Sequence, residues 1–151
     1  MISSPEFIKG YSPDEISQIE RLYNIDVKDD FKCFLEKIGR CDGGFMGDDS
    51  LVIYRKSWSV RSQLLFQINF FNDLQEIGAW DFLNKPFVFS VENESKYYFI
   101  QTSFNDEVYC YDENLEQVVD TGMRFCEYLI NLMKKNEPGG FNISQGELIK
   151  I

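Results

Sequence analysis

Histidine is absent from the 151 residues of this chain. Because His is the most common general base and the most common metal ligand in proteins, its absence removes the usual route to both kinds of chemistry. Neither a Ser-His-Asp triad nor a Cys-His pair can be assembled within the chain. The missing residue type therefore argues against an enzyme and favours a protein that acts by binding.

Closely spaced cysteines are also missing, because no two of the four stand in a Cys-x-x-Cys pair. Zinc sites are built from such pairs, and here no His is present to complete one. A domain of this length buries roughly 70% of its unfolded surface, so its core does not need disulfides. We therefore expect free thiols in a reducing compartment, with no metal and no cofactor.

Long apolar runs are absent as well. No stretch of about 18 apolar residues is available to span a membrane, and the first residues lack the basic segment followed by an apolar run that marks a signal peptide. We expect a cytoplasmic protein.

Positive charge is scarce, since 15 Lys and Arg face 25 Asp and Glu, for a net charge of −10. Nucleic acids and anionic membranes are bound through clustered Lys and Arg, so we expect neither as a partner. A basic protein partner is compatible with this charge, because complementary fields speed encounter and reject wrong partners. Solubility alone explains the acidity equally well.

The deficit of positive charge is concentrated between Ser62 and Met123. That segment has only two basic residues, Lys85 and Lys96, against eleven acidic ones. Aromatic rings rimmed by acids form a plausible docking face for a basic protein. The alternative, that the rings are core and the acids are turn residues, does not explain the near absence of Lys and Arg. The candidate protein-binding residues, chosen on this charge bias, are Trp58, Asp73, Glu76, Asp106 and Glu107.

The two tryptophans lie in different company. Trp58 has polar neighbours and is the better interface candidate, whereas Trp80 lies near Ile77 and Phe82 and is predicted to be in the core.

Helix signals recur along the chain. Ser12, Pro13 and Glu15 form a capping-box pattern that predicts a helix ending near Asn24. A second helix is predicted from Asp29 to Ile38, with Gly39 after it. The segment 62–80 is predicted to be mostly helical, although its apolar residues do not form one clean stripe. A last helix is predicted over residues 124–135, with Thr121 as its cap.

Short apolar runs predict strands. Residues 51–54 form one such run, and residues 87–91, 97–100, 108–111 and 116–119 follow at roughly ten-residue spacing with turn residues between them. The second group predicts an antiparallel meander. Together with the helices it predicts a single α+β domain over residues 1–136, followed by a C-terminal tail over residues 137–151.

Paired acids keep one enzymatic alternative open. Asp48-Asp49 lies in a Gly-rich loop, and Asp106-Glu107 and Asp112-Glu113 lie in predicted turns, where each pair could hold a cation. None of the pairs fits the calcium-loop pattern, which needs acids at alternate positions and a central Gly. The preference of Asp and Asn for turns explains them more simply.

Several motifs together carry a resemblance to a known family. They are, in chain order, the capped helix over residues 12–20, residues 31–35 with Gly39 and Gly43-Gly44, residues 87–89 and 98–99, Val108-Tyr109 with Asp112, and residues 125–129. Their order resembles the SUKH superfamily, the Smi/Knr-type domains, over roughly Gly10 to Lys135.

The resemblance implies an α+β fold in which helices pack on one antiparallel sheet. It also implies a bacterial immunity protein that binds and neutralises a cognate polymorphic toxin, often a basic nuclease. A non-catalytic regulatory or scaffold domain of the same fold, as in the fungal relatives, is the alternative. The family has no common catalytic residues, which agrees with the absence of His.

Overall fold

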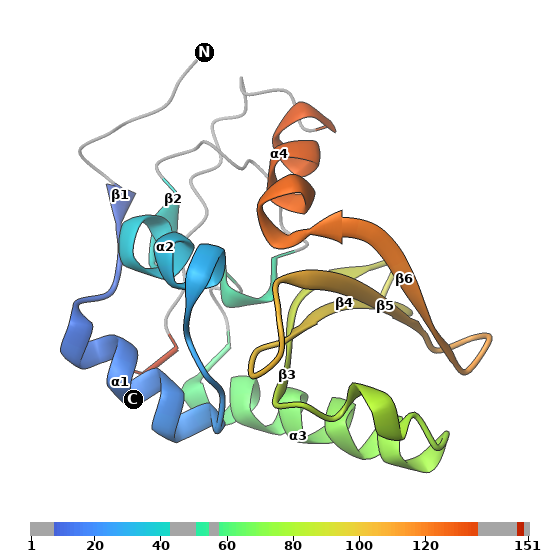
Figure 1. The fold of residues 1–151 in the computed structure, drawn as a ribbon. Helices are drawn as coiled ribbons and strands as arrows, with labels where there is room; N and C mark the ends of the chain where they lie inside the picture. Colours follow the sequence, from blue (N-terminus) through green and yellow to red (C-terminus); the bar gives the residue numbers. More distant parts are fainter. Residues whose placement is uncertain (1–7, 43–50, 55–57, 136–147, 150–151) are drawn as a thin grey trace.

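The computed structural model describes residues 8–42, 51–54, 58–135 and 148–149, and these residues form an α+β domain (Figure 1). Its main sheet is an antiparallel meander in the order β3-β4-β5-β6. The elements in chain order are β1 (Ile8–Lys9), α1 (Pro13–Tyr23), α2 (Asp29–Ile38), β2 (Cys41–Asp42), the 3₁₀ turn η2 (Val52–Tyr54), α3 (Val60–Glu76), the 3₁₀ turn η3 (Trp80–Phe82), β3 (Pro86–Glu92), β4 (Lys96–Gln101), β5 (Glu107–Asp112), β6 (Gln117–Arg124) and α4 (Phe125–Lys135).

The first two helices begin and end where the sequence predicts. The Ser12 hydroxyl accepts a hydrogen bond from the Glu15 N–H at 3.3 Å, and Glu15 Oε1 accepts one from the Ser12 N–H at 2.9 Å, which completes the capping box. Asn24 ends α1 in the left-handed conformation. In α2, Phe31, Phe34 and Leu35 are buried.

The pleat of the sheet sorts its aromatic side chains between two faces. In β4, Tyr98 and Ile100 pack on the side of α1, α2 and α4, whereas Tyr97 and Phe99 pack on the side of α3. Figure 1 shows α3 and α4 on opposite sides of the sheet. The predicted meander is therefore confirmed, with apolar layers on both of its faces.

Helix α3 confirms the helical prediction for residues 62–80 and explains its irregular pattern. Phe70 and Leu74 are buried against the sheet, while Leu65 and Ile68 point away from it and are about half exposed. The Gln67 side chain bonds both the N–H and the C=O of Val88, at 3.0 and 2.8 Å, on the edge strand β3. The helix thus has two apolar stripes. Its sequence therefore lacks the single apolar stripe that is typical of a surface helix.

Three local predictions are wrong. Residues 51–54 are not a strand, because Leu51 forms only an isolated bridge with Ser90 and the next three residues make the turn η2. All four residues are buried. A short apolar run that is buried on every side has the same sequence pattern as a buried strand, which explains the wrong prediction. Thr121 does not cap α4, because it lies inside β6 and its hydroxyl donates to the Val108 carbonyl at 2.7 Å.

The third wrong prediction concerns Trp80, which is 66% exposed instead of in the core. Gly78, with φ of +75°, reverses the chain after α3 and leads into η3. Phe82 takes the inner position in that turn and packs edge-on against Tyr109, with ring centroids 5.1 Å apart.

Part of the predicted tail belongs to the core. Leu148 is fully buried in the cluster that contains α1 and α2. The Tyr23 hydroxyl donates to the Leu148 carbonyl at 2.7 Å, and the Leu148 N–H donates to the Tyr11 hydroxyl at 3.0 Å. The rest of the tail up to residue 147, and the Gly-rich loop with Asp48 and Asp49, lie outside the described residues.

We expect Leu148→Ala to lower the free energy of unfolding by about 2–4 kcal/mol, because it leaves a cavity in a closed core. Urea unfolding followed by circular dichroism measures this. Leu115→Ala is the matched control, because Leu115 is 64% exposed and its loss should cost less than about 0.5 kcal/mol. Equal midpoints for the two variants would show that Leu148 does not stabilise the fold.

Candidate protein-docking surface

Two hairpin turns bring acidic residues to the same end of the sheet. In an antiparallel meander, the β3–β4 and β5–β6 turns lie at one end of the strands, and the β4–β5 turn lies at the other end. The Glu113 N–H donates to the Ser95 carbonyl at 2.9 Å, which fastens the two turns together. This contact places Glu94, Glu113 and Glu116 at a single end of the molecule.

The second half of α3 adds two more carboxylates there. Phe70 of α3 packs against Tyr97 of β4 and Tyr111 of β5, with centroid distances of 6.1 and 6.0 Å. Asp73 and Glu76 follow Phe70 by three and six residues, which places them on the same side of the helix. Burial raises the pKa of Asp73, and the charges of Glu76 and Glu113 raise it further, so the helix and the turn act on one carboxyl group.

The two tyrosines report the same crowding of negative charge. Burial, the charge of Glu113 and a 3.2 Å hydrogen bond from the Tyr97 hydroxyl to Glu113 raise the pKa of Tyr97 to about 12. Burial raises the pKa of Tyr111, and the charges of Asp73 and Glu113 add to the effect. We call this surface the acidic aromatic face, which consists of Asp73, Glu76, Glu94, Tyr97, Glu113 and Glu116, with the buried ring of Tyr111 packed against Tyr97.

Lys and Arg of the described residues form no ion pair at the centre of this face, which Asp73, Glu76 and Glu113 make up. The carboxylates therefore repel one another across partly buried rings, where screening by water is incomplete. A cationic surface brought against them would relieve this repulsion.

Three of the five sequence-predicted residues lie on or beside the acidic aromatic face. Asp73 and Glu76 belong to it. Trp58 is half-buried and reaches it through Phe66, whose ring centroid lies 5.1 Å from that of Trp58 and 5.9 Å from that of Tyr97. The chain of rings extends the apolar part of the face along α3.

Asp106 and Glu107 lie at the opposite end of the sheet, in and beside the β4–β5 turn. Asp106 is only 3% exposed, accepts a hydrogen bond from the Asp30 N–H at 3.3 Å and lies 3.7 Å from an Arg124 nitrogen. Burial raises its pKa. Its carboxylate holds the start of α2, while Glu107 accepts a hydrogen bond from Tyr109 at 3.0 Å. The structure does not bring these two residues to the acidic aromatic face.

Sequence reasoning missed the turn residues and the two tyrosines. Glu94, Glu113 and Glu116 stand in the first and third turns of the predicted meander, and alternate turns of a meander lie at the same end of the sheet. That rule, applied to the acids between Ser62 and Met123, would have grouped them and left out Asp106. Asp73 lies at this end of the sheet because of the way α3 packs, and the sequence alone does not predict that packing.

The described residues contain neither a cluster of metal-ligating side chains nor a membrane-spanning helix. No group of three or more Cys, Asp or Glu side chains there is arranged to hold a metal ion. No helix among those residues has the length and apolar character needed to cross a bilayer.

The fold defines the class of protein as a single α+β domain with an antiparallel meander between helices. The SUKH_5 family model, described as SMI1-KNR4 cell-wall, matches residues 2–134, and the chain belongs to this family. This confirms the resemblance in the sequence. No curated protein and no solved structure matches the chain.

We expect Asp73→Asn to stabilise the protein at pH 7. Folding raises the pKa of Asp73, so the folded state holds this proton more tightly than the unfolded state does. Ionisation of Asp73 therefore lowers the stability of the protein as the pH rises through the raised value, and Asn avoids this loss. The difference in free energy of unfolding between Asp73→Asn and the natural chain, measured by urea unfolding, should therefore shrink as the pH falls towards the ordinary pKa of an aspartate. It should also shrink in high salt.

Glu36→Gln is the matched control, because it removes one negative charge at an exposed position of α2 outside the acidic aromatic face. An Asp73→Asn variant that is less stable than the natural chain at pH 7 would contradict the proposed repulsion.

Proposed function

We propose that this protein is a non-catalytic immunity protein that binds and neutralises a cognate polymorphic toxin with a basic surface. The observation that carries the proposal is the acidic aromatic face, where five carboxylates from a helix and two turns surround the half-buried ring of Tyr97. Membership of the SUKH family supports it, because immunity proteins are the bacterial branch to which the sequence motifs are similar.

The composition of the face suits a docking surface for protein. The half-buried rings of Tyr97 and Phe66 offer rigid apolar area, and tyrosine is enriched among residues that dominate binding energy. The surrounding carboxylates only accept hydrogen bonds and favour Lys and Arg on the partner. A nuclease toxin has such a surface, because it must itself attract a polyanion.

Mutual repulsion in the free protein strengthens the argument. Burial and the charges of Glu76 and Glu113 raise the pKa of Asp73, so its ionised form is less favourable in the folded protein than in water. Binding a cationic partner therefore recovers free energy that folding alone leaves unrecovered. Solubility alone would be served as well by carboxylates spread over the surface, where they would repel one another less.

A non-catalytic regulatory or scaffold role is the second candidate. The family description, SMI1-KNR4 cell-wall, favours it, since it associates the family with cell-wall proteins. A pulldown from the native cell at low and high salt separates the two. A toxin encoded beside this gene supports the immunity role, whereas housekeeping partners alone support the regulatory role.

We expect coexpression of this protein to rescue cells from the toxin encoded beside it, and Glu113→Lys to weaken the binding of that toxin about tenfold, or about 1.4 kcal/mol. The loss should be mainly in the association rate at low salt and should shrink at high salt, as steering by charge requires. Surface plasmon resonance at low and high salt measures both the affinity and the association rate.

Glu36→Lys makes the same change of charge on α2 and should leave the affinity nearly unchanged. Equal losses for the two variants would mean that only net charge matters. Full rescue with unaltered binding by Glu113→Lys would exclude the acidic aromatic face as the docking surface.

A further inference from the structure

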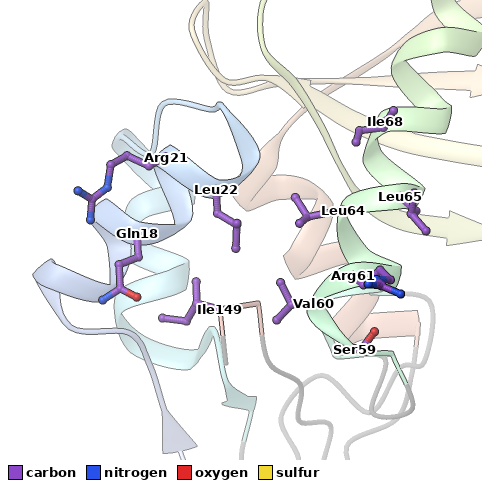
Figure 2. Close-up of a pocket in the computed structure, with 10 residues that line it drawn as sticks. All are labelled: Gln18, Arg21, Leu22, Ser59, Val60, Arg61, Leu64, Leu65, Ile68 and Ile149. Carbon is purple, nitrogen blue, oxygen red and sulfur yellow. The ribbon is translucent and has the colours of Figure 1, made fainter. Parts of the chain in front are cut away.

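A groove with a volume of about 1130 Å³ lies between α1 and α3 (Figure 2). Leu22 comes from α1, and Leu64, Leu65 and Ile68 come from α3, so most of the lining is apolar. Figure 2 shows Leu22 and Leu64 pointing into the space between the two helices. The groove uses the stripe of α3 that faces away from the sheet.

Its apolar lining is accessible to a partner. Leu22 is 40% exposed, and Leu65 and Ile68 are each 52% exposed. Neighbouring exposed leucine and isoleucine side chains on two helices form an apolar surface, and such surfaces on soluble domains mark interaction sites. Ligand pockets for small molecules enclose 70–90% of their ligand. The exposure of this lining suits a partner that lies along the groove instead.

Charge identifies the kind of partner. Arg21 stands on the α1 side and Arg61 on the α3 side of the groove (Figure 2). Neither forms an ion pair with any described carboxylate, although the chain has 25 acidic residues. The groove is therefore apolar with basic rims, on a protein whose net charge is −10.

We propose that this groove binds an amphipathic helix of a partner protein, with apolar residues on one face and acidic residues at the borders of that face. A third helix laid between two others can pack its side chains into the grooves of both. Helix α3 has 17 residues and a length of about 25 Å, which can support several turns of the partner. Each Arg can bind a carboxylate through two parallel hydrogen bonds.

Other occupants fit less well. Two copies of this chain paired by twofold symmetry across the groove would bring arginine-rimmed surfaces together. An anionic membrane would repel a protein of net charge −10. The groove is distinct from the acidic aromatic face, and its partner is opposite in charge to the proposed toxin surface. The inference therefore stands independently of the proposed function.

The test uses two designed 18-residue peptides labelled with fluorescein. Both have leucine at helical positions i, i+3, i+4 and i+7, and the flanking positions hold Glu in one peptide and Lys in the other. Fluorescence anisotropy with the full chain at low salt measures their affinities. We expect the Glu peptide to bind at least tenfold more tightly than the Lys peptide.

Variants locate the binding. Leu65→Glu places a charge on an exposed part of the lining and should weaken the Glu peptide at least tenfold. Leu115→Glu, at a 64% exposed position in the β5–β6 turn, is the matched control and should leave that affinity unchanged. Arg21→Glu combined with Arg61→Glu should reverse the preference in favour of the Lys peptide. Urea unfolding checks that each variant is folded.

Several outcomes would overturn the proposal. They are equal binding of the two peptides, no binding of either, and undiminished binding by folded Leu65→Glu. Self-association in ultracentrifugation that Leu65→Glu abolishes would assign the groove to a second copy. Tighter peptide binding after deletion of residues 150–151 would assign it to the chain's own end. Glu113→Lys should not change peptide binding, so failure here is distinguishable from failure of the proposed function.

Discussion

The alternation of side chains along β4 and β5 is the constraint on which the rest of the structure depends. Successive residues send Tyr97 and Phe99 to one face and Tyr98 and Ile100 to the other. Each face then needs its own cover, which α3 supplies on one side and α2 with α4 on the other. A shift of one residue in register would exchange the two sets of rings and misplace every contact that holds the helices.

The same constraint places the acidic aromatic face. Tyr97 and Tyr111 lie opposite each other on neighbouring strands, with ring centroids 5.9 Å apart, and Phe70 of α3 packs on both. The hairpin turns at their ends must then lie beside the second half of α3. Carboxylates gathered in this way repel one another and lower the stability of the free protein. Such a local cost is common where a surface is shaped for binding and not for folding alone.

Local signals were sufficient to predict the first two helices, the meander and the helical nature of residues 62–80. A capping box, a glycine after a helix and ten-residue spacing between strands act over short distances. Packing decided the rest. The run at residues 51–54 is buried on all sides, Trp80 is turned outward by Gly78, and Asp106 supports the start of α2. For the candidate site, the sequence located the charge bias, whereas only the fold separated Asp106 and Glu107 from Asp73 and Glu76.

Helix α3 contributes to both surfaces, since Asp73 and Glu76 belong to the acidic aromatic face and Leu65 and Ile68 line the groove. A rigid element shared in this way links two equilibria. If occupation of the groove moves α3 against Tyr97 and Tyr111, it changes the affinity of the acidic aromatic face by some factor. Thermodynamic reciprocity then requires that a cationic partner change the affinity of the groove by the same factor. The second apolar stripe of α3, which obscured the helix in the sequence, would then give the fold a means of heterotropic regulation.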